Sequence, residues 1–247
     1  MSPSSVQEAL SFHMSLLDWY HAHMSDRDEI FRQYFNQVDM TLELDESVDD
    51  DEFDVFNSVE MLVKLTGAPD GSYLKVSRGT DEAELFHIVV RNRIFKYPSE
   101  YALANRSDGF GLELYVDSIT LRDEYQNKGI GPRSMLLSLL EAKAQGFRYV
   151  SLTAAGSSNN RGTFWGYYVW ASMGFDAVLP SEILCSLPER LSHVRRLAEL
   201  MLDDEGRQWW YHPGGRAIDV EFDLSPDSLS WTVLRNYVEA KGISYEY

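Results

Sequence analysis

Two glycines one residue apart, Gly129 and Gly131, mark residues 125–135 as a candidate ligand-binding turn: the stretch reads Tyr-Gln-Asn-Lys-Gly-Ile-Gly-Pro-Arg-Ser-Met. Glycine lets a ligand approach the backbone closely, and the N–H groups at the start of a helix attract anions. Pro132 suits the first position of such a helix, and a basic residue stands on each side of the glycines. The stretch therefore predicts a site for a phosphate-like anion. A tight turn without a ligand is the alternative.

Three kinds of phosphate-binding loop compete for this stretch. A nucleotide P-loop has the pattern Gly-x-x-x-x-Gly-Lys-Ser/Thr, which the stretch lacks. A dinucleotide-binding turn has a third glycine, where this chain has Ser134, and a later acidic residue, which is missing near residue 151. The third kind holds the pyrophosphate of coenzyme A, and the glycine spacing fits it.

The segment Gln126-Asn-Lys-Gly129-Ile-Gly131 resembles the acyl-CoA-binding motif of the GNAT acetyltransferase superfamily, Gln/Arg-x-x-Gly-x-Gly/Ala. In that superfamily the motif follows a central strand and opens a helix, and a further strand and a helix closing on Gly-Phe come next. The matching parts of this chain are residues 110–121, the glycine stretch, residues 149–153 and Gly174-Phe175. The clear resemblance covers residues 110–178, whereas residues 5–38 and 58–94 fit more loosely.

This resemblance implies direct transfer of an acyl group, most simply acetyl, from acetyl-CoA to an amine in a ternary complex. It also implies that backbone N–H groups from Ile119 to Leu121 polarise the thioester carbonyl. The residues expected to bind the cofactor are Ile119, Leu121, Gln126, Asn127, Lys128, Gly129, Ile130, Gly131, Arg133, Asn159 and Asn160. The alternative is a catalytically silent GNAT-like domain that binds acyl-CoA or a partner protein.

Acyl transfer to an amine needs a base for the proton on nitrogen and an acid for the departing thiolate. Glu113, Tyr115 and Asp117 share one face of the alternating strand at residues 110–121. The resemblance implies that a carboxylate of this strand is the base, so Glu113 and Asp117 are the candidates. Surface or ion-paired carboxylates are the alternative reading.

The usual proton donor of the superfamily is a tyrosine five residues before the phenylalanine of Gly-Phe. In this chain that position is Trp170, and an indole cannot act as a general acid. Tyr167, about one helical turn earlier, and Tyr168 are therefore the candidate donors. Packing of both rings in the core, or along the channel for the pantetheine arm, is the alternative.

Strands and helices are predicted around these residues. We expect strands at residues 58–66, 72–78, 85–94, 110–121, 147–153 and 217–222, and helices at 5–24, 25–38, 132–145, 162–173, 188–203 and 228–240. This pattern indicates an α/β (α+β) protein with a single domain over residues 1–247. The resemblance implies a mixed, mostly antiparallel central sheet flanked by helices. Its clearest core spans residues 55–180, with N-terminal helices at 5–38 and a C-terminal extension at 181–247.

Composition limits the partners and the location. The net charge of −17 argues against a nucleic-acid partner, and it suits either a cationic acceptor amine or plain solubility. One cysteine, no signal-like N-terminus and no apolar run of membrane length favour a cytoplasmic protein without a membrane partner. His13, His21 and His23 lack partners at ligand spacing, so no metal site is expected. The resemblance also allows a homodimer.

The segment Gly206-Arg-Gln-Trp-Trp-Tyr-His-Pro-Gly-Gly215 is unusually rich in aromatic residues. Trp209 and Trp210 suggest a hydrophobic clamp that holds this segment to the rest of the protein. A place in a substrate pocket is the second interpretation.

Overall fold

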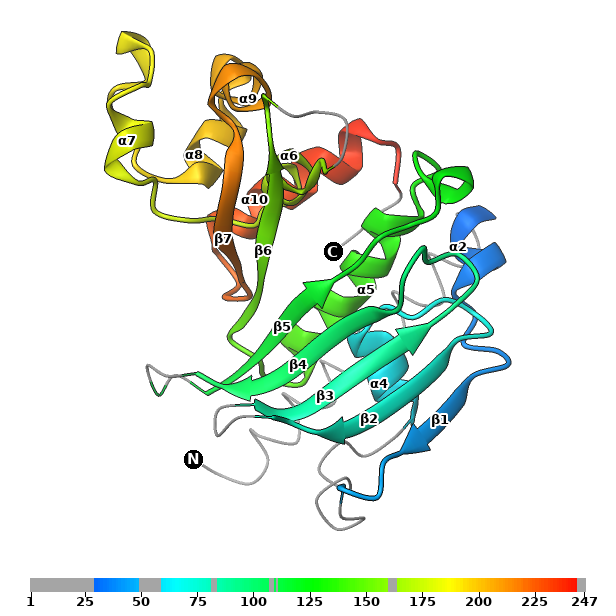
Figure 1. Ribbon diagram of the computed structural model, residues 1–247. Coiled ribbons are helices and arrows are strands. Elements are labelled where there is room, and N and C mark those ends of the chain that lie inside the picture. Colours follow the sequence, from blue (N-terminus) through cyan, green and yellow to red (C-terminus); the bar gives the residue numbers. More distant parts are fainter. Residues whose placement is uncertain are drawn as a thin grey trace, which may run out of the picture.

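The computed structural model describes residues 29–48, 59–80, 84–106, 109, 111–159 and 164–243. A single sheet of seven strands contains β1 to β7 in the order of the chain (Figure 1). The strands are β1 Thr41–Leu44, β2 Tyr73–Arg78, β3 Glu84–Arg91, β4 Ser99–Asn105, β5 Leu112–Ser118, β6 Tyr149–Ser157 and β7 Arg216–Asp223. Strand β1 pairs with β2, and β5 with β6, in parallel, whereas the other neighbours are antiparallel. The predicted mixed, mostly antiparallel sheet is confirmed.

Helices fill the connections and the C-terminal part. They are α2 Glu29–Tyr34, α4 Val59–Leu65, η2 Asp123–Tyr125, α5 Ile130–Ala144, α6 Gly166–Ser172, α7 Ser181–Leu184, η3 Glu189–Leu191, α8 Leu197–Leu202, α9 Asp204–Trp209, η4 Trp210–Gly214 and α10 Leu229–Ala240. Among these described segments, no helix is both long and apolar enough to cross a membrane. The helix predicted at residues 5–24 lies outside the described residues.

One face of the sheet is buried by helices α4, α5, α6 and α10 (Figure 1). Side chains alternate along each strand, so Leu114 and Val116 of β5 are buried while Asp117 is exposed. The neighbours repeat this alternation, since Leu114 pairs with Val150 of β6, which pairs with Phe222 of β7. The opposite face of β5, β6 and β7 is therefore left for polar side chains.

The strand predicted at residues 58–66 is wrong, because this segment forms helix α4. Lys64 forms an ion pair with Glu60 at 2.7 Å, four residues earlier, which is helical spacing. Leu62 and Leu65 are fully buried, and the Leu65 carbonyl accepts a hydrogen bond at 2.6 Å from Ser138 of α5. A run of apolar residues fits a buried strand and a buried helix equally well, and here packing on α5 decides the outcome.

Neither strand β4 nor strand β1 is among the strands expected from the sequence. Alanine and asparagine in β4 have low strand propensity, and Pro98 directly precedes it. Nevertheless Tyr101 and Leu103 are buried, and the Tyr101 hydroxyl donates to the Thr66 carbonyl at 2.8 Å at the end of α4. Tertiary contacts, rather than local preference, make this segment a strand.

The helix predicted at residues 188–203 is broken into η3 and α8. Asp176, which is buried, causes the new start: its carboxylate accepts the Ala198 N–H at 2.8 Å and forms an ion pair with Arg196 at 2.6 Å. An acidic side chain that binds free N–H groups in this way stabilises the first turn of a helix.

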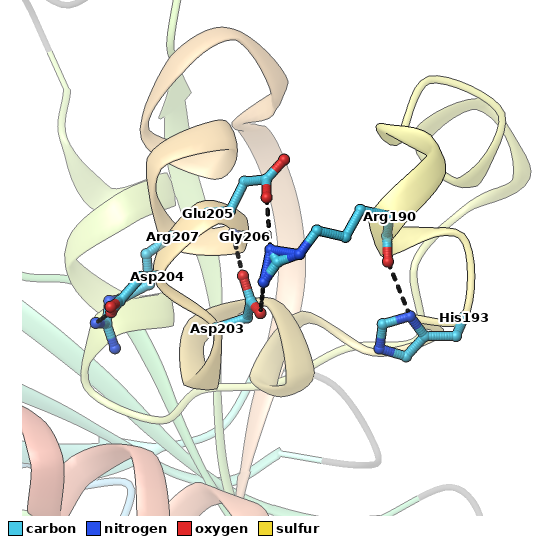
Figure 2. Close-up of polar contacts among 7 residues, drawn as sticks. All are labelled: Arg190, His193, Asp203, Asp204, Glu205, Gly206 and Arg207. Carbon is cyan, nitrogen blue, oxygen red and sulfur yellow. Dashed lines mark hydrogen bonds and ion pairs between the residues drawn. The ribbon is translucent and has the colours of Figure 1, made fainter.

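Helix α9 is held to η3 by a small polar cluster. Figure 2 shows the Arg190 guanidinium between two carboxylates, at 2.9 Å from Asp203 and 2.5 Å from Glu205. Asp203 also caps α9, because its other oxygen accepts the Gly206 N–H at 2.9 Å. This cluster fixes the position of the helix that leads into the aromatic segment at 206–215.

Candidate active site

The parallel strands β5 and β6 separate after a short stretch of pairing. Within the described residues they share four residue pairs, from Glu113 opposite Tyr149 to Val116 opposite Leu152. Beyond Leu152, β6 continues to Ser157 beside β7 alone, and Figure 1 shows both strands turning away from β5. The facing edges of β5 and β6 therefore carry backbone groups that the sheet does not use, and these groups can pair with an extended ligand.

The glycine turn lies just after β5 and opens helix α5. Gly129 precedes the helix with φ of 74°, and Asn127 also has a positive φ of 58°. Left-handed residues next to a helix start are a backbone pattern that occurs in anion-binding nests. The Arg133 guanidinium donates to the Gly129 carbonyl at 2.9 Å. Its positive charge adds to that of the helix N-terminus.

Glycine occurs at positions 129 and 131 for different reasons. A Cβ atom at Gly129 would lie 2.3 Å from the Arg133 guanidinium, and the backbone there is left-handed, so the protein itself needs this glycine. At Gly131, φ is not left-handed, and the nearest atom to a Cβ would be the Leu121 methyl group at an ordinary 3.6 Å. The fold does not require glycine at this position. The missing side chain removes atoms that would stand at the first turn of α5, where a helix start attracts anions.

Within the described residues, the chain between β5 and the glycine turn pairs with residues 94–96 on one side only. The Lys96 N–H donates to the Thr120 carbonyl at 2.8 Å, and the Arg122 N–H donates to the Ile94 carbonyl at 2.9 Å. This pattern makes Leu121 the non-hydrogen-bonded partner of Phe95, so the Leu121 backbone groups face the opposite side. That side is the one from which β6 has separated.

Gln126 supports the turn through its own side chain. Its amide nitrogen donates to the Leu121 carbonyl at 3.0 Å and to the Asp123 carboxylate at 3.1 Å. These contacts close the loop over η2 and bring Leu121 next to the glycine turn. Gln126, a fixed position of the motif, therefore stabilises the turn, and its amide nitrogen is already used in hydrogen bonds within the protein.

The two candidate bases have different surroundings. Glu113 lies at the paired end of β5, where it accepts a hydrogen bond from Ser151 and lies 3.6 Å from Arg106. Arg106 also pairs with Glu221 of β7 at 3.0 Å, so Glu113 belongs to a cross-strand ion network. Asp117 lies beyond the last β5–β6 pair and is exposed. The position of Asp117 suits a base at the point of separation better than that of Glu113.

A chain of hydroxyl groups crosses the open face next to Asp117. The Tyr115 hydroxyl of β5 lies 3.3 Å from Thr153 Oγ1 of β6, and Thr153 Oγ1 donates to the Asp219 carboxylate of β7 at 2.6 Å. Thr153 is the first residue of β6 beyond the pairing with β5. Thr153 and Asp219 have no recognisable signal in the sequence, because residue 219 is brought opposite residue 153 only by the register of β6 and β7.

The two candidate proton donors on α6 also differ. Tyr167 is fully buried, and its hydroxyl donates to the Tyr211 carbonyl at 3.1 Å. Tyr168 is partly buried and lies edge-on to Tyr211, with 5.0 Å between ring centroids. Burial raises the pKa of Tyr237 on α10, and the nearby Tyr168 phenol contributes to the same direction. Trp170 packs edge-on against Phe175 at 5.6 Å.

The aromatic segment at residues 206–215, which includes the end of α9 and all of η4, serves both as a clamp and as the wall of a pocket. Trp210 is fully buried, and its ring nitrogen donates to the Tyr167 carbonyl at 2.9 Å. An open pocket of about 540 Å³ lies beside it, lined by Tyr168, Asp204, Arg207, Gln208, Tyr211 and His212. The pocket does not reach the glycine turn, but it shares Tyr168 with the candidate catalytic residues.

The remaining candidates are scattered. Lys128 is exposed, with its amine 5.6 Å from the Tyr125 ring, and Asn159 is exposed in the turn after β6. Asn160 and the three histidines near the N-terminus lie outside the described residues. In the part of the chain that the structure describes, no group of three His, Cys, Asp or Glu side chains could hold a metal ion.

No protein-family model matches the sequence, and a search of the curated proteins finds no match either. Among solved structures, the chain is similar to a GNAT family acetyltransferase from Elizabethkingia anophelis with acetyl-CoA bound, with 18% identity over 38% of this chain and a TM-score of 0.27. It covers 56% of that protein, little more than half its length. It is also similar to nourseothricin acetyltransferase, with 15% identity and a TM-score of 0.30. That match covers 68% of this chain and 95% of the other. Likenesses this distant leave the function to be inferred from the residues and contacts described above.

Proposed function

We propose that this chain is a GNAT-type N-acyltransferase that moves an acyl group, most simply acetyl, from acetyl-CoA to an amine. The observation that carries this proposal is the separation of β5 from β6 together with the glycine turn, which follows β5 after η2 and has at position 131 a glycine that the fold itself does not require. Two parallel strands that part beside a helix N-terminus offer both an edge for an extended chain and a cradle for phosphate. Coenzyme A is an extended ligand that needs both.

Each part of acetyl-CoA has a matching surface in this proposal. The pyrophosphate binds the N–H groups at Asn127 to Gly131, and Arg133 contributes positive charge beneath them. The amides of the pantetheine arm pair with the free edge of β5. The thioester carbonyl accepts hydrogen bonds from backbone N–H groups between Ile119 and Leu121, which stabilise its developing negative charge.

The chemistry then follows from the neighbouring side chains. The amine nitrogen attacks the thioester carbon, and Asp117 accepts the proton that the nitrogen loses as the N–C bond forms. The C–S bond breaks, and the thiolate takes a proton from the Tyr168 hydroxyl or from water. We propose Tyr168 rather than Tyr167 for this step, because Tyr167 is fully buried and its proton is already donated to the Tyr211 carbonyl.

A catalytically silent protein that binds acyl-CoA or a partner protein is the second candidate. It is supported by Trp170, which stands where the superfamily has its tyrosine and packs against Phe175. Binding without turnover would then be the activity of the chain.

Thermal unfolding with and without acetyl-CoA tests the binding step. A ligand at 100 times its dissociation constant stabilises a protein by about 2.7 kcal/mol, which raises the midpoint by a few degrees. Gly131→Val should leave the midpoint of the free protein close to wild type but remove the shift. Gly146→Ala, at the other end of α5 with φ of 79° and no atom near its Cβ, should lower the midpoint and keep the shift.

Release of free CoA thiol, measured with spermidine, tyramine and a lysine-containing peptide as acceptors, separates the two candidate functions. An enzyme releases thiol faster with one of these amines than without. A shift in midpoint without any amine-dependent release would favour the silent protein. The absence of a shift with acetyl-CoA, free CoA and longer acyl-CoAs would refute the enzyme and a silent acyl-CoA-binding protein, and would leave a protein that binds a partner protein.

A further inference from the structure

The direction of the hydrogen bonds between Tyr115, Thr153 and Asp219 follows from their chemistry. A threonine hydroxyl has one proton, and the Asp219 carboxylate can only accept, so Thr153 donates to Asp219 across 2.6 Å. Thr153 Oγ1 must then accept the proton of the Tyr115 hydroxyl across 3.3 Å. The lone pairs of the Tyr115 oxygen are left to accept a proton from a third group.

The chain of hydroxyls runs across three strands at the point where β5 and β6 part. Thr153 and Asp219 are directly opposite each other in the β6–β7 register, and Thr153 is the first β6 residue beyond the β5 pairing. Asp117 follows Tyr115 by two residues and shares its face of β5. Tyr115 is therefore on the same face of β5 as the proposed base, and Asp219 lies two strands away, exposed to water.

We propose that Tyr115, Thr153 and Asp219 form a proton relay that deprotonates the cationic form of the acceptor amine. This inference depends on the acyltransferase function proposed above. The ammonium N–H proton passes to the Tyr115 oxygen, the Tyr115 proton passes to Thr153 Oγ1, and the Thr153 proton passes to the Asp219 carboxylate. The nitrogen gains the lone pair that it needs for attack. Tyr115 and Thr153 each keep one proton, and Asp219 becomes a neutral acid that releases its proton to water.

The reaction requires two proton acceptors, which is why a second route beside Asp117 is needed. An ammonium group loses one proton to become nucleophilic and a second one as the amide forms. One of these ends on the CoA thiol and the other leaves for the solvent. A single carboxylate at Asp117 holds only one proton at a time. Asp219 on β7 is exposed, so its proton can leave to water.

In this relay Tyr115 is a catalytic residue, because it touches the amine, and Thr153 and Asp219 act through it. Steady-state kinetics with acetyl-CoA and the fastest of the three amines tests these roles. Tyr115→Phe should lower kcat on the order of 10²-fold, which is typical of a lost proton-transfer group. Thr153→Val, which keeps the shape but interrupts the relay, and Asp219→Asn should each lower kcat and leave the KM for acetyl-CoA unchanged.

Two further variants separate a relay from a structural effect. Thr153→Ser restores the hydroxyl and should recover most of the kcat lost in Thr153→Val. The matched control is Glu221→Gln, which removes a carboxylate two residues from Asp219 that is bonded to Arg106 instead of to Thr153. It should turn over like wild type. The double variant Thr153→Val with Asp219→Asn should be no slower than Thr153→Val alone, because both interrupt one path.

The relay is refuted if Thr153→Val turns over like wild type, if Thr153→Ser is as slow as Thr153→Val, or if the two losses multiply. In each of these cases a wild-type protein that acetylates the amine leaves the acyltransferase function standing. A wild-type protein that shows no thermal shift with acetyl-CoA and no release of thiol refutes the proposed function itself, and the relay with it.

Discussion

The hydroxyl groups of Tyr167 and Tyr168 adjoin each other in sequence but have different environments. Tyr167→Phe removes a buried hydrogen bond to the Tyr211 carbonyl, so it should cost about 1 kcal/mol of unfolding free energy and leave kcat unchanged. Tyr168→Phe should lower kcat on the order of 10²-fold, as expected for a lost general acid, with little change in stability. Thermal unfolding and initial rates check both. A loss of kcat in Tyr167→Phe without one in Tyr168→Phe would reverse this assignment.

Single residues show where sequence reasoning reaches the site and where it stops. Gly129 and Gly131 are recognisable because their spacing recurs at a helix start, and the structure places them there. Glu113 and Asp117 are indistinguishable in an alternating strand, yet one joins an ion network with Arg106 and the other does not. Thr153 has no signal in the sequence, since its significance depends on which residue of β7 lies opposite.

Helix α5 carries a buried carboxyl group on the side that faces α4. Glu141 is 4% exposed, and burial raises its pKa above the ordinary value of 4.5, although a hydrogen bond from Gln145 and the charge of Lys64 oppose this rise. A raised pKa means that the folded protein binds this proton more tightly than the unfolded chain. Stability from this group is therefore present below pH 4.5 and is lost as the pH rises through the raised pKa.

Glu141→Gln should consequently stabilise the protein at neutral pH and have no such effect below pH 4.5, where both side chains are neutral. Urea unfolding of both proteins across this range measures the difference. Glu124→Gln, on the exposed turn before the glycines, is the control for a general change in charge. A difference between Glu141→Gln and wild type that stayed constant with pH would contradict this account.

Elements were predictable where local chemistry and packing agree. The start of α5 has its glycines and proline, and its end has Gly146 in a left-handed conformation, so the helix was predicted within two residues. Residues 59–65 have an apolar run that suits a strand as well as a helix, and contact with α5 makes them a helix that ends just before Gly67, which has a φ of 57°. Residues 99–105 have weak strand formers, and contacts from both neighbouring strands and α4 hold them in the sheet. In both segments, residues distant in sequence determine the structure.

At the scale of the whole molecule, side-chain contacts join the two parts of the sheet on either side of the β5–β6 separation. Arg106 reaches from the end of β4 to Glu221 of β7 and stacks on Tyr149 of β6, with 4.2 Å to the ring centroid. Lys143 of α5 lies 4.6 Å from the Trp231 ring of α10. We propose that these contacts, together with the shared strand pairs, make the chain a single domain.

A single domain should unfold in one cooperative transition. Five of the six tryptophans lie between residues 165 and 231, so their fluorescence reports on the part with β6 and β7, whereas far-UV circular dichroism reports on the whole chain. Urea curves from both signals should coincide, and Arg106→Ala should shift them together to lower urea. Two separate midpoints would instead indicate two domains that unfold independently.

The strand order of the sheet repeats the order of the chain, which has a consequence for how the molecule is made. A ribosome delivers the chain from its N-terminus, and each new strand then finds its partner already synthesised. No strand waits for a distant one, as it would if the first and last strands had to pair. While the residues of α5 are being added, β5 is the growing edge. Among the described residues, the last part of that same edge has no neighbouring strand in the finished protein either, so the edge that waits for β6 during synthesis is also the edge that stays partly open.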